Sequence, residues 1–109
     1  MAFYIVEATL KEKTLSDLQA KLADGAFTNL RPFGPTISHS LRNARRRPNG
    51  RVVWEEEDYC TPPLAQEREA VLDQYFHSIE VTPVAKGKGW ASIKALPPLF
   101  PTLADETRT

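Results

Sequence analysis

The chain has 109 residues, of which 41% are hydrophobic and 26% charged, and its 14 Lys and Arg balance its 14 Asp and Glu. This length and composition predict a single domain with one modest core. The zero net charge removes any global electrostatic basis for binding nucleic acid or an anionic membrane, so only local patches remain. The lone cysteine, Cys60, excludes a disulfide-stapled extracellular scaffold.

The sequence shows no targeting or membrane segment. Its first apolar run is short and has no basic region before it, unlike a signal peptide. No apolar run approaches the ~20 residues that a membrane helix needs. We therefore expect a soluble, cytoplasmic protein that does not enter a membrane.

A strand, a helix and a loop are expected in the first third of the chain. Residues 3–10 are rich in β-branched and aromatic side chains, which favours a central strand. Residues 15–24 predict a helix that Thr14 could cap and Gly25 would end, with an apolar stripe of Leu15, Leu18, Leu22 and Ala26. Two prolines and a glycine in residues 29–35 predict a loop.

Residues 36–60 predict a β-hairpin around which the rest of the chain is arranged. Pro48-Asn49-Gly50 favours a type I turn followed by a left-handed Gly50, which places Arg47 opposite Arg51 and Arg42 opposite Glu56. A two-residue Asn49-Gly50 turn would instead pair Arg42 with Glu57 and exchange the two faces of the hairpin. Both registers pair arginines with acids across the strands.

The last third of the chain predicts a second helix and one or two strands. Thr61 and Pro62 suit the start of a helix over residues 62–76. Its apolar stripe is Leu64, Val71, Leu72 and Tyr75, and its water-facing residues are Glu67, Arg68, Glu69 and Asp73. Residues 78–84 favour a strand, where Pro83 indicates an edge or an end. Residues 86–89 predict a turn, and residues 90–96 a short extra strand.

The order strand, helix, strand, strand, helix, strand predicts an α+β protein of the ferredoxin-like βαββαβ plan. In that plan an antiparallel sheet carries two helices on one face. We expect one α+β domain over residues 1–97, with a possible extra C-terminal strand, and a proline-rich, partly disordered tail over residues 98–109.

One candidate site is an arginine group that could contact an anion or nucleic acid: Arg42, Arg45, Arg46, Arg47 and Arg51. The return strand that would face these arginines reads VVWEEEDY, and its acids cancel their attraction for phosphate. We therefore favour the hypothesis that the arginines pair with these acids across the hairpin, and we disfavour nucleic acid as a partner.

Four residues near the end of the hairpin are weak catalytic candidates: His39, Glu57, Tyr59 and Cys60. Cys60 precedes a helix N-terminus, which lowers a thiol pKa, although buried cysteines more often serve as small hydrophobes. A carboxylate desolvated on one face of the sheet would gain the raised pKa that acid–base catalysis requires. Two separated histidines and one cysteine give no metal-binding spacing, so we expect neither a metal nor a cofactor.

No motif in the chain specifies a reaction. The leading hypothesis is a small α+β module that acts through association, as a homodimer formed by the sheet face or the tail. The first alternative is a small-molecule-binding protein or enzyme of the dimeric α/β-barrel type, in which His39, Glu57 and Tyr59 supply polar groups. The second alternative is weak RNA binding through the Arg42–Arg51 patch.

Overall fold

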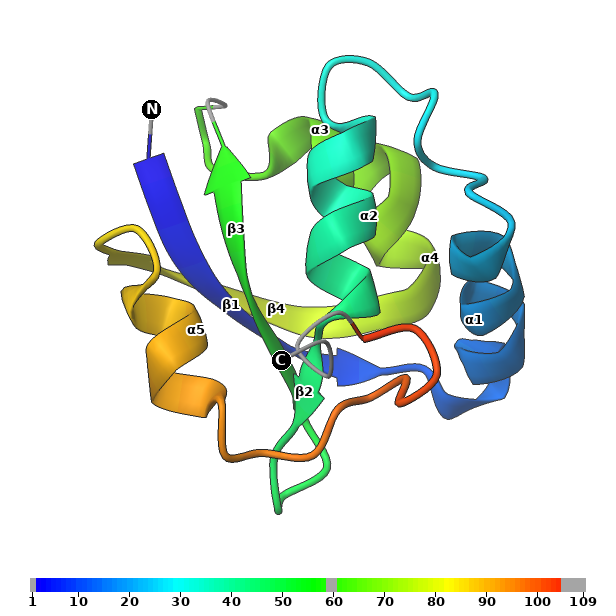
Figure 1. Cartoon of the computed structure of the whole chain (residues 1–109). Helices are drawn as coiled ribbons and strands as arrows, with labels where there is room; N and C mark the ends of the chain where they lie inside the picture. Colours follow the sequence, from blue (N-terminus) through cyan, green and yellow to red (C-terminus); the bar gives the residue numbers. More distant parts are fainter. Residues whose placement is uncertain (1, 59–60, 105–109) are drawn as a thin grey trace.

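The computed structural model describes residues 2–58 and 61–104. A four-stranded sheet forms its centre, with helices packed around it (Figure 1). In chain order the elements are β1 (Ala2–Leu10), the 3-10 turn η1 (Glu12–Thr14), α1 (Leu15–Ala23), α2 (Gly34–Arg42), β2 (Arg45–Arg46), β3 (Val52–Asp58), α3 (Ala65–Glu67), the π-helical turn η2 (Arg68–Leu72), α4 (Asp73–Tyr75), β4 (Phe76–Val84) and α5 (Lys88–Ile93).

The sheet is antiparallel throughout, and its strand order is β2-β3-β1-β4. β1 is central: Val6 lies opposite Trp54 of β3 on one side and opposite Val81 of β4 on the other. β4 is an edge strand within the described residues, which suits Pro83 because proline cannot donate a ladder hydrogen bond. The prediction of an α+β fold with an antiparallel sheet is confirmed.

The main core lies on one face of this sheet. Val6, Ala8 and Trp54 point to that face and are completely buried. Most of the apolar residues predicted for the two helices join them, with Leu18, Leu22, Leu64, Val71, Leu72 and Tyr75 all buried. Leu15 is only half-buried, and Ala26, which lies beyond the end of α1, is exposed. The opposite face is covered at one end by α5, where Val53 and Ile93 are buried (Figure 1).

The first strand and the first helix form where the sequence predicts them, at β1 and α1. Gly25 follows α1 with φ of +72°, the left-handed conformation that ends a helix. Thr14 does not cap α1. Its hydroxyl donates to the carbonyl of Lys11 instead, because the short turn η1 precedes the helix.

The hairpin prediction is wrong over residues 36–42, which belong to the helix α2, and α2 also takes Gly34 and Pro35 from the predicted loop. Ile37 and Leu41 are both buried, and a spacing of four fits the same face of a strand or of a helix, so the pattern alone did not separate them. Pro35 in the first turn suits a helix start. Arg42 therefore lies at the end of a helix and does not sit opposite Glu56 or Glu57 on a strand.

The helix α2 lies along the edge of β3 that a strand was predicted to cover (Figure 1). Along β3, β2 pairs with Val52 and Val53 alone. Farther along β3, the hydroxyl of Ser40 donates to the carbonyl of Glu55 at 2.8 Å. A helix side chain thus satisfies a backbone group that would otherwise be left open at the sheet edge.

The turn at Pro48-Asn49-Gly50 is confirmed, together with the first of the two registers. The Arg47 amide donates to the Arg51 carbonyl at 2.8 Å, and Arg46 lies opposite Val52. Gly50 has φ of +89°, as the left-handed position requires. The predicted hairpin is therefore correct at its turn and extends for only two residues of β2.

The second helical segment begins at Ala65, three residues later than predicted. Thr61 does not act as its cap. Leu64 precedes the helix with φ of +65°, and its amide donates to Oδ2 of Asp58 at 2.6 Å. A carboxylate at the end of β3 therefore fixes where the helix starts. The start is set by a contact between two elements and not by the residues next to it in the sequence.

The last part of the chain departs from the predicted strand at residues 90–96, because residues Lys88–Ile93 form the helix α5. The segment that follows packs on the domain. The Arg46 amide donates to the Pro97 carbonyl at 3.0 Å, the Leu99 amide donates to the Ala44 carbonyl at 2.8 Å, and Phe100 is buried in the core. Residues 105–109 of the predicted tail lie outside the described residues.

None of the described helices is long and apolar enough to cross a membrane.

Candidate functional site

Two adjoining cavities lie beside the C-terminal half of β3, and together they form what we call the acidic groove. The first has a volume of about 470 Å³ and lies between β3, the start of α2 and α3. The second, of about 330 Å³, lies between β3, α2 and α5. Thr36 and Glu57 line both cavities, so the two spaces share a wall.

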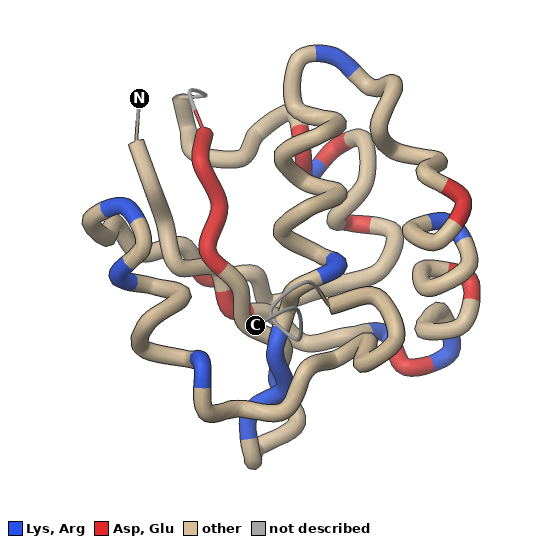
Figure 2. Tube along the Cα trace, in the orientation of Figure 1, with Lys and Arg blue, Asp and Glu red and all other residues tan. Residues whose placement is uncertain are grey.

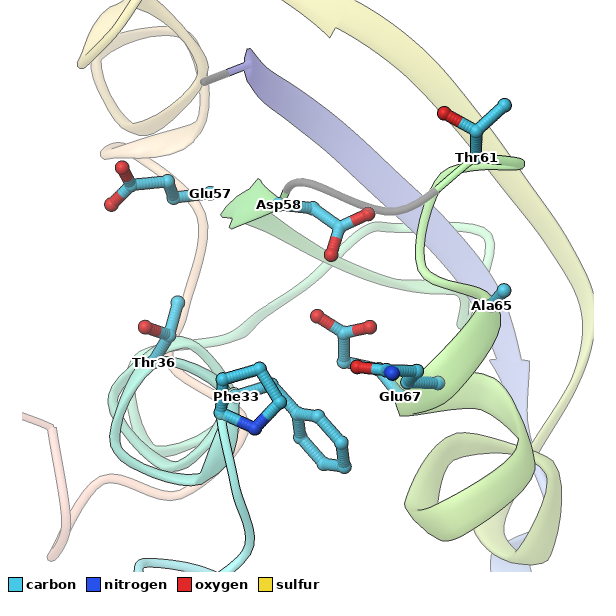
Figure 3. A pocket seen from close by; sticks show the side chains of 9 residues that line it. Phe33, Thr36, Glu57, Asp58, Thr61, Ala65 and Glu67 are labelled. Carbon is cyan, nitrogen blue, oxygen red and sulfur yellow. The ribbon is translucent and has the colours of Figure 1, made fainter.

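The first cavity is lined by two carboxylates that are almost completely buried. Asp58 is 4% exposed and Glu67 is 1% exposed. Figure 3 shows the two carboxylates turned toward one another, with Phe33 beside them. Burying two carboxylates in one cavity is costly, and a cation placed near them would lower that cost.

A third carboxyl, that of Glu56, belongs to the same face of β3 as Asp58. Glu56 is 1% exposed; its Oε1 accepts a hydrogen bond from Nε1 of Trp54 at 2.8 Å, and its Oε2 has no hydrogen-bond partner. Burial and, to a smaller extent, the charges of Glu67 and Asp58 raise the pKa of Glu56 to about 8, against the hydrogen bond from Trp54, which lowers it. Glu56 therefore carries a proton at neutral pH.

The second cavity combines aromatic and polar side chains. His39, Glu57, Phe3 and Trp90 line it, and the rings of His39 and Trp90 meet edge to face with centroids 6.3 Å apart. Two of the four predicted catalytic candidates, His39 and Glu57, are thus brought to one cavity. The other two, Tyr59 and Cys60, lie outside the described residues.

Glu55 at the base of the second cavity has a structural role. Its carboxylate accepts the amide of Gly87 at 2.9 Å and the amide of Trp90 at 3.1 Å, which fixes the start of α5. Gly89 allows this approach, because a Cβ at that position would lie 2.8 Å from Oε1 of Glu55. The backbone amides at the start of α5 therefore stabilise the negative charge of Glu55, and Glu55 in turn positions α5.

The arginines pair mostly with acids other than those predicted. Arg46 pairs with Glu12 at 3.1 Å, and Arg47 pairs with Glu7 at 2.7 Å. Arg51 pairs with Glu7 at 3.6 Å and Glu80 at 3.2 Å. Figure 2 shows the acidic run of β3 extending away from the basic turn. The acids of β3 are consequently placed to line the groove.

The two other arginines bond backbone carbonyls. Nη1 of Arg45 donates to the Leu96 carbonyl at 2.7 Å, and Arg45 is only 8% exposed. Nη1 of Arg42 donates to the Leu22 carbonyl at 3.1 Å, at the end of α1. The five arginines thus do not form one continuous basic surface, which the nucleic-acid hypothesis requires.

Sequence reasoning missed Glu67, which it placed in water. The signal was present in the spacing, because residue 67 lies three positions after Leu64 and four before Val71, on the apolar face of the helix. The prediction placed Glu67 in water because of its charge, although its position in the helix indicated burial. Thr36, Phe33 and Trp90 were also missed, since their place in the groove depends on α2 and α5, which the sequence did not reveal.

In the described part of the chain, no group of three or more His, Cys, Asp or Glu side chains is arranged to hold a metal ion. Comparison with known proteins found no matching family model, no matching curated protein and no matching solved structure.

Proposed function

We propose that this protein binds a small molecule that carries a positively charged group, such as an amine or a guanidine, in the acidic groove. The observation that carries the proposal is the pair of buried carboxylates, Asp58 and Glu67, which line one cavity. A cation bound in the cavity would further lower the cost of burying two carboxylates, beyond the hydrogen bond that Asp58 accepts from the Leu64 amide. This proposal takes up the small-molecule-binding hypothesis and adds the chemical class of the ligand.

The aromatic walls of the groove suit the apolar part of such a ligand. Phe33 lines the first cavity, and Phe3 and Trp90 line the second. Pockets that bind small molecules combine apolar walls with a few convergent polar groups, and aromatic faces also attract cations. Glu56 lies beside the two carboxylates but is protonated, so it adds no negative charge. One or two cationic groups would then balance the charge of Asp58 and Glu67.

A ligand panel matched in shape and varied in charge tests this proposal. We expect butylamine and butylguanidine to raise the melting temperature of the protein in a saturable manner, and butanol and butyrate to leave it unchanged, because only a cation compensates the carboxylates. Thermal unfolding at constant ionic strength would measure these shifts. Equal responses to the amine and the alcohol would contradict a charge-selective site.

We also infer that the topology is a variant of the ferredoxin-like plan. β1 and β2 both run antiparallel to β3, which lies between them, and β3 and β4 both run antiparallel to β1. This arrangement corresponds to two interleaved split βαβ units. The departures are the additional helix α2 before β2, the two-residue length of β2, and α5 on the opposite face of the sheet.

Association into a homodimer stays a prediction. On the face of the sheet beside α5, Phe3, Ile5 and Val84 are only half-buried, and such apolar residues would anchor a second copy. Light scattering coupled to size exclusion would decide this, with a dimer mass expected and a monomer at high concentration contradicting it. RNA binding through the Arg42–Arg51 patch is the weaker hypothesis, because three of these arginines already pair with Glu7, Glu12 or Glu80.

A further inference from the structure

A further cavity lies between α2 and the end of α1, and it shares Pro35 and His39 with the second cavity of the acidic groove. Its volume is about 340 Å³. Leu22 and Gly25 form one wall, and Ser38, His39 and Arg42 form the other. The last three residues lie within about one helical turn of each other on α2, so their side chains line one side of the cavity.

Ser38 has an unsatisfied hydrogen-bonding group at this cavity. The residue is 7% exposed, and its hydroxyl has no hydrogen-bond partner. Buried hydroxyls in native proteins are almost always hydrogen-bonded, so this one calls for an explanation. A ligand that accepts a hydrogen bond from Ser38 would supply the missing partner.

Arg42 provides a fixed positive charge beside Ser38. Its Nη1 donates to the carbonyl of Leu22 at 3.1 Å, and both residues line the cavity, so this bond holds the guanidinium beside it. No acidic side chain of the described residues forms a salt bridge with Arg42, in contrast to Arg46 and Arg47. The remaining donors of Arg42 are therefore placed to bind an anion, for which the planar guanidinium is well suited.

We propose that this cavity binds a small tetrahedral oxyanion, either inorganic phosphate or the phosphate group of a small phosphomonoester. The Ser38 hydroxyl and the Arg42 guanidinium donate hydrogen bonds to its oxygens, and the imidazole of His39 lies on the same wall of the cavity. Phosphate offers several acceptor oxygens to such converging donors. This proposal does not rest on the proposed function, although His39 also lines the second cavity of the acidic groove, and its ligand has the opposite charge.

The test is a titration of ¹⁵N-labelled protein with inorganic phosphate and, separately, with glycerol phosphate, with sodium chloride holding the ionic strength constant. We expect saturable NMR shifts of the Ser38, His39 and Arg42 amides. Saturation by both compounds would indicate phosphate itself as the ligand, and saturation by glycerol phosphate alone would indicate a phosphomonoester. Shifts no larger than those caused by chloride alone would overturn the proposal.

Variants locate the site. Ser38→Ala and Arg42→Gln should each weaken binding about tenfold or more, the contribution expected of a hydrogen bond to a charged group. The exposed Arg31 lies outside the cavity, so Arg31→Gln is the matched control and should bind like wild type. Ser38→Ala also removes an unpartnered hydroxyl, so its melting temperature without phosphate should equal or exceed that of wild type. Wild-type affinity in both Ser38→Ala and Arg42→Gln would refute the site.

Discussion

Glu56 is a buried carboxyl that interacts electrostatically with Asp58 and Glu67 of the acidic groove. Glu56 lies on β3 and is 1% exposed. Its pKa is raised to about 8, mainly by burial and to a smaller extent by the charges of Glu67 and Asp58. In the unfolded chain the same carboxyl has a pKa of 4.5. Between these two values the folded protein therefore holds a proton that the unfolded chain has released.

This difference predicts a fall in stability with rising pH. The contribution of Glu56 is fully present below pH 4.5 and is lost as the pH rises through 8, at about 1.4 kcal/mol per pH unit. The free energy of unfolding of wild type should therefore drop by a few kcal/mol between pH 5 and pH 8. Urea denaturation at the two pH values would measure it.

Glu56→Gln provides the control for that pH dependence. The glutamine keeps an oxygen that can accept the hydrogen bond from Trp54, and it does not ionise. The variant should lose most of the fall between pH 5 and pH 8 and should be more stable than wild type at pH 8. A pH dependence as steep as that of wild type would show that Glu56 is not its source.

At the scale of elements, α2 determines where both cavities of the groove can form. Its start depends on Gly34, where a Cβ would lie 2.3 Å from the carbonyl oxygen of Phe27 and 2.8 Å from that of Thr28. Such a distance requires the backbone to move. The glycine therefore permits the close approach of the loop and the helix.

Gly34→Ala should destabilise the protein by about 3 kcal/mol, the upper end of the usual cost of overpacking, because backbone atoms rather than a side chain must shift. Gly50→Ala is the comparison. A Cβ at Gly50 would meet nothing within 4 Å, so only its φ of +89° is strained, and we expect a loss of about 1–2 kcal/mol. Chemical denaturation of both variants measures the difference, and an equal or smaller loss for Gly34→Ala would contradict the packing argument.

The elements that the sequence predicted correctly are those whose signals are local. β1, α1 and the Gly50 turn depend on residue types and spacings within a few positions. The missed helices depend on distant partners: α2 on the space beside β3, and α5 on the carboxylate of Glu55, more than thirty residues earlier. Such contacts leave no periodic pattern in a short segment.

The candidate site was predictable to the same partial extent. His39 and Glu57 were identified as polar groups of a cleft, and they line the second cavity. The opposing pair Asp58 and Glu67 required knowledge of how the end of β3 meets α3, where Asp58 also holds the Leu64 amide. Sequence reasoning expected these acids to pair with arginines or to face water.

At the scale of the whole molecule, a chain of zero net charge separates its charges in space. The basic residues of β2 and its turn lie at one end of the sheet, and the acidic residues of β3 extend toward the other (Figure 2). Arg46 and Arg47 are compensated by Glu12 and Glu7, so they do not neutralise the groove. The local field in the groove should therefore attract a cation despite the neutral overall balance.

Calorimetric titration of butylamine into wild type and three variants tests the central claim most directly. Asp58→Asn and Glu67→Gln should each weaken binding at least about tenfold, because each removes one charge from the cavity. Glu69→Gln is the matched control, since Glu69 is exposed on the same helical segment and lies outside both cavities of the groove. Wild-type affinity is expected for Glu69→Gln and weaker binding for the other two variants; equal affinity in all four proteins, or no binding to wild type, would contradict a cation site at Asp58 and Glu67.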